Sequence, residues 1–301
     1  MTLVRQSVTS GVLQVALETV GPADGWPVVL LHGFPFGPHS FETVAEGLAR
    51  VGARVVVPYL RGFGPTRFTV AATPRSGQQA AVGRDVLDLV HALDLRDPIL
   101  AGFDWGGRAA CVAAVLRPDL IGGLVALGGY SIQDIAASVE PGPPLQESRD
   151  WYQYYFHGAR GRAGLTRNRR EIAAQLWREW SPVRPVVEAD FDRAAAAFDN
   201  PDFVDVVIHS YRHRFGLVAG APAYEADERV LARSPMVDVP SIVLEPTQDP
   251  ALALRSTGRH AAHFARLLDH RRIVSGHHQP YDAPDDVIRA LLDLHDSVQT
   301  G

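Results

Sequence analysis

A carboxylate occupies the place of a nucleophile in the segment Gly102-Phe103-Asp104-Trp105-Gly106. Glycines on both sides permit a sharp strand-to-helix turn that exposes the central side chain, and such frames usually carry serine. A carboxylate with a reference pKa of about 3.9 is ionised near neutral pH and can attack without a base. Attack on a saturated carbon that bears a strained oxygen or a halogen gives an alkyl ester, which water can hydrolyse. Asp104 is therefore the predicted nucleophile, although an aspartate here could also serve only to cap the following helix.

Hydrolysis of an ester on Asp104 needs a base that activates water. Histidine has a suitable pKa, and His277 follows the last strand-like segment directly after a glycine. We therefore favour His277 over its neighbour His278. Asp249 follows the preceding strand-like segment and is the predicted acid that orients the histidine, with Asp134 as the competing candidate.

Water that attacks the ester carbonyl generates an oxyanion, which two backbone N–H groups can stabilise. In sites with such a strand-turn-helix nucleophile, one donor follows the first apolar strand and the other follows the nucleophile. Phe34 and Trp105 are the predicted donors, because Pro35 has no N–H group.

Strand-like apolar segments alternate with helical segments, a pattern that predicts crossover connections and a parallel sheet. The predicted strands are 27–31, 53–57, 99–103, 120–127, 242–244 and 272–274, and the predicted helices are 41–51, 76–93, 171–180, 203–214 and 284–294. We predict an α/β core formed by residues 1–130 and 235–301. Residues 131–234 form a helical cap at the carboxyl edge of the sheet, where ligands of such sheets bind.

Composition restricts the partners. The 301 residues contain 29 basic side chains, all of them arginine, and the absence of lysine excludes a Schiff-base or P-loop lysine mechanism. A net charge of −5 is not typical of nucleic-acid-binding proteins, and no apolar run is long enough to cross a membrane. The first residues lack the apolar core of a secretion signal. We expect a cytoplasmic protein without nucleic-acid or membrane partners, and a homodimer stays open.

Cofactor and metal ligands are not evident either. The single cysteine, Cys111, lies in an apolar helical segment and is expected to be buried and inert. His260 and His263 have helical spacing but no further ligand nearby in sequence, whereas a metal site needs three or four ligands. We expect neither a metal nor a cofactor.

With these motifs the chain resembles the α/β-hydrolase superfamily, in particular its branch of epoxide hydrolases and haloalkane dehalogenases with an aspartate nucleophile. The resemblance covers nearly the whole chain and is closest to soluble epoxide hydrolases. It implies a mostly parallel central sheet with a helical cap inserted after the sixth strand. The matching segments are His32-Gly33-Phe34-Pro35, Arg61-Gly62-Phe63-Gly64, Asp104-Trp105-Gly106-Gly107 and Gly276-His277.

The resemblance also implies residues for epoxide opening, which needs a proton or a strong hydrogen bond for the developing alkoxide. Tyr152, followed by Gln, and Tyr211, followed by Arg, match the cap tyrosines that hold the epoxide oxygen in soluble epoxide hydrolases. Both could also be ordinary packing residues. The predicted activity is conversion of a small apolar epoxide and water to a vicinal diol. The implied substrate pocket includes His32, Pro35, Trp151 and Gln153.

Two other functions stay open. A haloalkane dehalogenase would hold halide with Trp105 and a second indole, for which the cap offers Trp151, Trp177 and Trp180. A haloacid dehalogenase would hold the carboxylate with arginines one and four places after the nucleophile; Arg108 matches the second, but Trp105 replaces the first. The chain could instead bind a small ligand without turnover, although a binder has no need for Asp104, Asp249 and His277 together.

Overall fold

The computed structural model describes residues 3–252 and 257–299, and it has a central sheet of nine strands within these ranges. The order across the sheet is β1-β2-β4-β3-β6-β7-β8-β9, with the short β5 paired to β2. All pairs from β4 to β9 are parallel, whereas β1, β2 and β4 pair antiparallel. The strands are β1 (Val4–Ser10), β2 (Leu13–Val20), β3 (Trp26–Leu31), β4 (Ala53–Pro58), β5 (Arg67–Phe68), β6 (Ile99–Gly102), β7 (Gly123–Leu127), β8 (Ser241–Pro246) and β9 (Leu267–Ile273).

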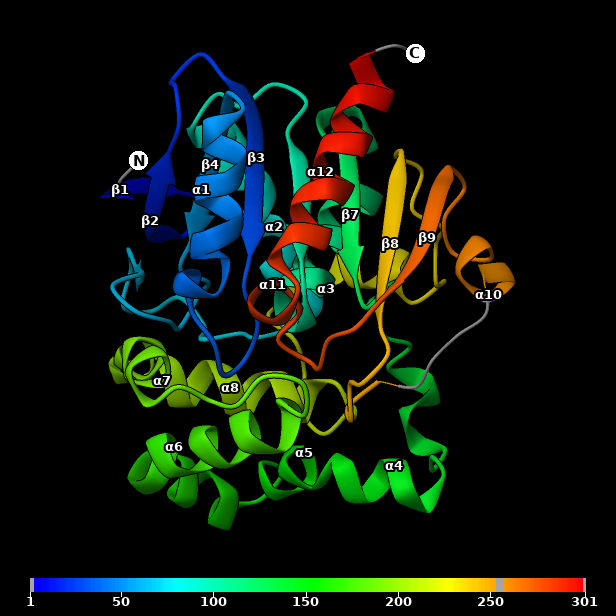
Figure 1. Ribbon diagram of the computed structural model, residues 1–301. Helices are drawn as coiled ribbons and strands as arrows, with labels where there is room; N and C mark the ends of the chain where they lie inside the picture. The colour runs from blue at the N-terminus through cyan, green and yellow to red at the C-terminus, as the bar shows by residue number, and fades with distance from the viewer. Residues whose placement is uncertain (1–2, 253–256, 300–301) are drawn as a thin grey trace.

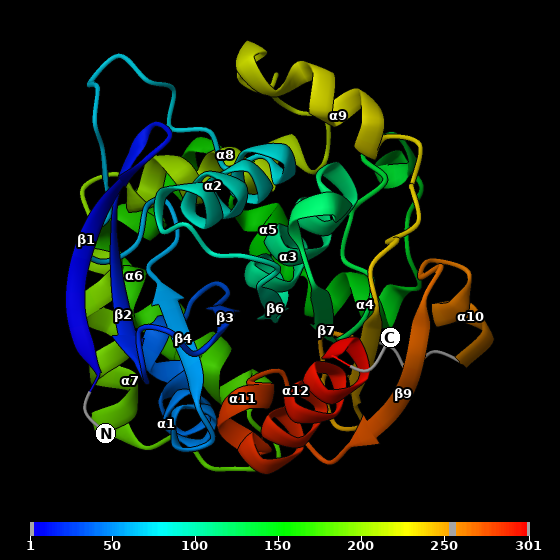
Figure 2. The ribbon, with the colours of Figure 1, turned by 90° about the horizontal axis from the view of Figure 1, so that it is seen from above.

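Helices cover both faces of the sheet, which explains why its central strands are almost continuously apolar. All residues of β6, β7 and β8 are buried. One face carries α1 (Glu42–Arg50), α11 (Gln279–Asp282) and α12 (Pro284–Gln299), and the other carries α2 (Gln79–Ala92) and α3 (Asp104–Leu116) (Figure 2). The short α10 (Thr257–Ala261) lies beside β9. This is the α/β-hydrolase fold that the sequence predicts.

Helices alone connect β7 to β8, and most of them lie together beyond the carboxyl ends of the parallel strands (Figure 1). We call the segment from α4 to α9 the helical insertion. It follows β7, which is the sixth strand when the two-residue β5 is not counted. Its helices are α4 (Pro144–Arg149), α5 (Trp151–Tyr155), α6 (Ala159–Trp180), α7 (Glu188–Ala195), α8 (Phe203–His213) and α9 (Glu225–Leu231).

An aromatic cluster joins the insertion to the sheet. Phe34, in the loop after β3, lies 5.5 to 6.4 Å between ring centroids from five other rings. Each large buried aromatic side chain contributes about 1.5–3 kcal/mol of burial energy, so the cluster is a major source of adhesion between the insertion and the sheet. The five rings are those of Trp105, Tyr152, Phe156, Phe203 and Tyr211.

Every strand and helix predicted above is present, and most ends shift by a few residues. Three ends differ more: α6 begins at Ala159 and not at 171, β9 begins at Leu267 and not at 272, and α12 ends at Gln299 and not at 294. A smaller correction concerns 120–127, where the strand begins only at Gly123 because a short 3-10 helix, Pro118–Leu120, precedes it. The sequence did not predict β1 or β2. Most of β1 is exposed at the sheet edge, so it lacks the apolar run that marks the buried strands.

Candidate active site

Asp104 lies on a sharp turn between β6 and α3, with a left-handed φ of 51°. A side chain at either flanking glycine would collide with the backbone: a Cβ at Gly106 would lie 2.0 Å from the Leu31 oxygen, and one at Gly102 would lie 2.4 Å from the Gly106 oxygen. Only glycine fits at these positions. The turn therefore places Asp104 at the carboxyl edge of the sheet, beneath the helical insertion.

The Asp104 carboxylate is held by the loop after β3 and by His277. The backbone N–H of Phe34 donates to its Oδ1 at 2.7 Å, and its Oδ2 lies 3.6 Å from Nε2 of His277. Burial raises the pKa of Asp104, but the hydrogen bond and charge of His277 outweigh that effect and leave the pKa below its ordinary value. Asp104 is consequently ionised near neutral pH, as a nucleophile requires.

The two predicted oxyanion donors border the same carboxylate. Phe34 already donates to Asp104 Oδ1. Trp105 is the second residue of α3, and N–H groups in the first turn of a helix have no acceptor within that helix. Its ring stacks on that of Phe34 with centroids 5.9 Å apart, so the two residues pack against each other. The Phe34 N–H already contacts the oxygen on which an ester would carry negative charge, and the Trp105 N–H remains the predicted second donor.

His277 links Asp104 to Asp249. Its Nδ1 lies 2.8 Å from Asp249 Oδ2, and the Asp249 side chain is fully buried. Burial lowers the pKa of His277, but the charges and hydrogen bonds of Asp249 and Asp104 overcome that effect and raise the pKa to about 10. Asp249 therefore holds the ring in the orientation in which Nε2 faces Asp104.

The alternative base, His278, and the alternative acid, Asp134, lie away from the nucleophile. His278 is buried among aromatic rings, 4.4 Å from the ring of Phe36 and 5.1 Å from that of Trp177, and burial holds its pKa well below the ordinary value. Asp134 is exposed and accepts a hydrogen bond from the backbone of Ala137. Neither residue reaches Asp104, which supports the choice of His277 and Asp249.

Both predicted tyrosines face the nucleophile from the insertion. Tyr152 of α5 is 4% exposed and Tyr211 of α8 is 0% exposed, and their rings meet edge to face at 5.4 Å. The Tyr211 hydroxyl accepts a hydrogen bond from the indole of Trp105 at 3.3 Å. Burial raises the pKa of both phenols, so both are protonated at neutral pH and can act as donors.

The four residues predicted to line the substrate pocket make different contacts in the structure. His32 is fully buried: its Nε2 accepts from the Leu60 backbone at 3.2 Å, its Nδ1 lies 2.9 Å from the Gly33 oxygen, and burial lowers its pKa to about 4. It braces the loop that presents Phe34 and has no nitrogen left for substrate. The carbonyl of Pro35 accepts from the Trp177 indole at 2.7 Å.

Of the remaining two predicted pocket residues, Trp151 points toward the outside of α5, and Gln153 points toward Tyr152. The Trp151 indole donates to Glu179 at 3.2 Å near the surface. Gln153 donates to Asp150 at 2.8 Å and contacts the Tyr152 hydroxyl at 3.3 Å. Gln153 therefore positions a candidate donor, whereas Trp151 packs beside it.

One residue that the sequence did not single out also borders the site. Arg214, just after α8, is 8% exposed, and its guanidinium lies 4.5 Å from the centroid of the Tyr211 ring and 5.4 Å from that of the Trp105 ring. Its charge contributes to the low pKa of Asp104. Helical spacing of three residues from Tyr211 was the signal that could have found it.

The histidines outside the site were expected to lack ligand partners, and for His260 that expectation was wrong. His260 and His270 each lie 3.3 Å from one oxygen of the buried Glu245, and Arg272 donates to the same carboxylate at 3.2 Å. These side chains come from the consecutive elements β8, α10 and β9. His260 and His270 thus share the Glu245 carboxylate with Arg272, which serves as its counterion.

Cys111 is fully buried, as the sequence predicts, and burial raises its pKa to about 11.

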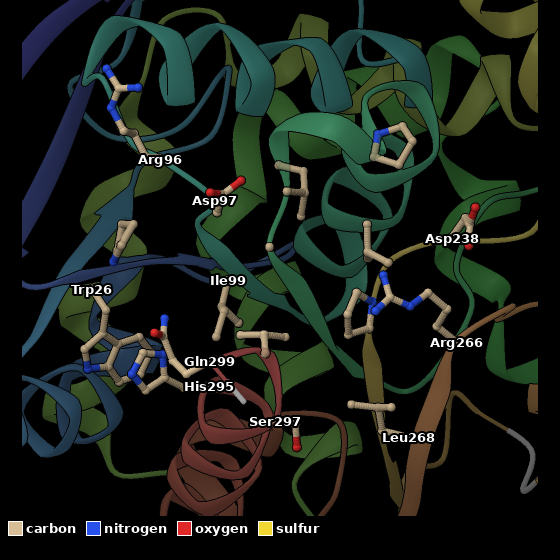
Figure 3. A pocket seen from close by; sticks show the side chains of 17 residues that line it. Trp26, Arg96, Asp97, Ile99, Asp238, Arg266, Leu268, His295, Ser297 and Gln299 are labelled. Atoms are coloured by element: carbon tan, nitrogen blue, oxygen red, sulfur yellow. The ribbon is translucent and has the colours of Figure 1, made fainter. Parts of the chain in front are cut away.

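A cavity of about 460 Å³ lies at the opposite edge of the sheet (Figure 3). Trp26 and His295 stack there with centroids 4.0 Å apart, and Ile99 marks the amino end of β6. Asp104 follows the carboxyl end of the same strand. The cavity is thus separated from the candidate active site by the length of strand β6.

Comparison with known proteins identifies the family. Residues 27–284 match the family described as alpha/beta hydrolase fold, so the chain belongs to that family. Several relatives are named epoxide hydrolases, and one is named a haloalkane dehalogenase. A solved structure from Klebsiella pneumoniae subsp. pneumoniae, described as a candidate epoxide hydrolase, has 39% sequence identity and a TM-score of 0.93 over 96% of each chain.

Curated relatives match over shorter segments. An epoxide hydrolase of Caballeronia sordidicola is 32% identical over 37% of this chain and 32% of its own length. A haloalkane dehalogenase of Mycolicibacterium paratuberculosis is 34% identical over 36% of each chain. The matches thus span about a third of these relatives.

In the ranges that the structure describes, none of the helices has the length and apolar character of a membrane span.

Proposed function

We propose that the protein hydrolyses epoxides to vicinal diols through a covalent ester on Asp104. The observation that carries the proposal is the arrangement of Asp104 between two sets of groups. His277 and Asp249 lie on one side, and the buried tyrosines Tyr152 and Tyr211 project from the insertion on the other. Relatives named epoxide hydrolases support the same reaction.

In the first step, an Asp104 oxygen attacks an epoxide carbon and the carbon–oxygen bond of the ring breaks. The released alkoxide takes a proton from one of the two tyrosines, which their raised pKa values keep protonated until the charge develops. The product of this step is a hydroxyalkyl ester of Asp104. Loss of the Asp104 charge also removes one of the causes that raise the pKa of His277.

In the second step, water attacks the ester carbonyl. Before water attacks, protonated His277 gives its proton, through solvent, to the tyrosinate formed in the first step. The neutral histidine then accepts the proton from water, and the Phe34 and Trp105 N–H groups stabilise the oxyanion. Collapse of the tetrahedral intermediate releases the diol and restores the Asp104 carboxylate. His277 is then protonated and the tyrosine is neutral, as before the first step, so one epoxide and one water give one diol.

The site favours this reaction over carbon–halogen hydrolysis. A halide needs free N–H donors, but the Trp105 indole donates to Tyr211 and the Trp151 indole donates to Glu179. The Trp177 indole is also taken, by the carbonyl of Pro35. Hydroxyl donors, which an alkoxide requires, are what the insertion presents to Asp104.

The test is a single turnover of an epoxide in water enriched in heavy oxygen, followed by mass analysis of the peptide that contains Asp104. We expect label in the Asp104 carboxylate, because water attacks the carbonyl carbon of the ester. In His277→Gln the unhydrolysed ester should accumulate, and Asp104→Asn is the control that cannot form it. An unlabelled Asp104 after turnover would overturn the mechanism. If no epoxide forms an ester in His277→Gln but a ligand still raises the melting temperature, the protein is a binder.

A further inference from the structure

Two histidines and a glutamate with buried side chains converge at the β8–β9 edge of the sheet. Nε2 of His260 lies 3.3 Å from Oε1 of Glu245, and Nε2 of His270 lies 3.3 Å from Oε2 of the same carboxylate. One ligand atom from each of the three residues lies within 4.8 Å of the other two. Among the residues that the structure describes, no other group of three metal-ligating side chains comes together in this way.

The spacing of these atoms matches a zinc site better than a set of charged hydrogen bonds. Zinc binds imidazole nitrogen and carboxylate oxygen at about 2.0–2.2 Å in a tetrahedron, so neighbouring ligand atoms lie about 3.3 Å apart. Hydrogen bonds between charged groups are shorter, at about 2.7–2.9 Å. Both contacts of Glu245 with the histidines have the longer spacing. Because each carboxylate oxygen faces one histidine, a bidentate Glu245 can supply two of the four ligand atoms.

Packing holds the two rings in this arrangement. His260 belongs to α10 and His270 to β9, and these elements lie side by side at the edge of the sheet (Figure 1). The rings are tilted by 51° with centroids 4.5 Å apart, so they converge on Glu245 and do not stack. A Cβ at Gly129, in the loop after β7, would lie 2.7 Å from Cε1 of His260. The loop therefore confines the His260 ring, and a modest rotation brings both Nε2 atoms onto one ion.

Burial indicates a structural site and not a catalytic one. The side chain of His260 is 1% exposed, that of His270 is 4% exposed and that of Glu245 is 5% exposed. A catalytic zinc keeps one position open to water or substrate, whereas a structural zinc is enclosed by its ligands. An ion held by these three residues would tie α10 to the two strands β8 and β9.

Arg272 is the group that an ion must displace. Its Nε donates to Oε2 of Glu245 at 3.2 Å, which is also long for a charge-assisted hydrogen bond. Its side chain is 55% exposed, in contrast to the buried carboxylate. Ion pairs with such an exposed partner contribute little stability, so Arg272 can turn toward solvent at small cost. A divalent ion then replaces the single positive charge beside Glu245.

The set of donor atoms restricts the identity of the ion. Magnesium and calcium take oxygen ligands, so two imidazoles are unsuited to them. Iron sites with two histidines and one carboxylate need further open positions, which enclosed side chains do not leave. Zinc accepts two imidazoles and a carboxylate in tetrahedral geometry.

We propose that Glu245, His260 and His270 bind one zinc ion, which clamps α10 to the sheet edge formed by β8 and β9. The proposal is independent of the reaction at Asp104, because it uses none of the groups of the candidate active site. The pair His260 and His263 gave no sign of it in the sequence, since the other two ligands lie on two different strands.

The first experiment is an isothermal titration of the metal-free full chain with zinc chloride at neutral pH. We expect one site per chain and a melting temperature that rises with the zinc concentration. His260→Gln and His270→Gln should each weaken binding by at least about a hundredfold, since loss of an outer-shell partner alone costs roughly 10–100-fold. His91→Gln removes an exposed histidine from α2 and should bind zinc as the wild type does.

Arg272→Gln distinguishes a metal site from a carboxylate that serves only in an ion pair. Removal of the competing cation should tighten zinc binding severalfold, and weaker binding in this variant would contradict the proposal. Cobalt in place of zinc gives a spectroscopic readout: the visible absorption of a tetrahedral site should appear in the wild type and disappear in His260→Gln.

Absence of zinc binding to the wild type, or binding that survives unchanged in both histidine variants, would overturn the proposal. The second result would assign the metal to other histidines of the surface. If the histidine variants fail to fold, the cobalt spectrum of the wild type and the affinity of Arg272→Gln decide. None of these measurements uses catalysis, so a failure of epoxide hydrolysis leaves their outcome unaffected.

Discussion

At the scale of single residues, the two tyrosines decide between the alternative reactions of Asp104. They are buried, their rings touch, and one of them is joined to the indole beside the nucleophile. Burial raises the pKa of both hydroxyls, which makes them poor spontaneous acids but effective donors to an alkoxide, whose conjugate acid is weaker still. A leaving halide gains much less from such a donor.

We therefore predict that Tyr152→Phe and Tyr211→Phe each lower the rate of ester formation from an epoxide by about 10²-fold, the range for loss of general acid catalysis. Rapid-quench measurement of the Asp104 ester in a His277→Gln background isolates this step. Tyr154→Phe is a matched control, because Tyr154 is on the same helix but exposed. Halide release from haloalkanes that survives both substitutions, with epoxide turnover absent, would favour dehalogenation.

At the scale of elements, the insertion caps the N-terminus of a core helix, α2. α2 has no side-chain cap of its own at Gln78, and Glu228 of α9 takes that role. The Glu228 carboxylate accepts from the Ala80 backbone at 3.0 Å and from the side chains of Gln78 at 3.1 Å and Gln79 at 3.3 Å. A negative charge at a helix N-terminus is also favoured by the helix dipole.

Replacement of Glu228 by Ala should lower the free energy of unfolding by about 1–3 kcal/mol, because it leaves partly buried donors of α2 unpaired. Urea unfolding followed by circular dichroism measures the change. Glu225→Ala removes an exposed acid from the same helix and should stay within about 0.5 kcal/mol of wild type. Equal effects of the two substitutions would contradict the assignment.

At the scale of the whole molecule, the charged group at the site links stability to pH. The pKa of His277 is about 10 in the folded protein, compared with an ordinary value of 6.5. A group whose folded pKa is raised contributes stability that is complete below pH 6.5 and is lost as the pH rises toward 10.

Wild type should consequently lose a stability advantage over His277→Gln between pH 6.5 and pH 10, on the order of a few kcal/mol at most. The check is the difference in unfolding free energy between the two proteins at several pH values, since groups common to both cancel. A difference that is constant across this window would mean that His277 is not charged in the folded state.

Sequence patterns located the groups that belong to the sheet, because strand ends and tight turns dictate where they point. The glycine frame around Asp104 and the loop positions of Asp249 and His277 are of this kind. Residues of the insertion were harder to assign. Trp151 turns outward, and Arg214 turns inward, because helix packing sets the direction of each side chain. The edge strand β1 was missed because it is held by its pairing with β2. Most of its residues are exposed, so no apolar run marks it in the sequence.

The last residue of α6 also contacts the loop that carries the candidate base. The Trp180 carbonyl accepts from the His277 backbone at 3.0 Å, and a Cβ at Gly276 would lie 2.5 Å from the same oxygen. Engineering the substrate range by exchanging the insertion for that of a relative would thus also alter the support of the base. A chimera needs its junction placed so that this carbonyl and the glycine opposite it are transferred as a matched pair.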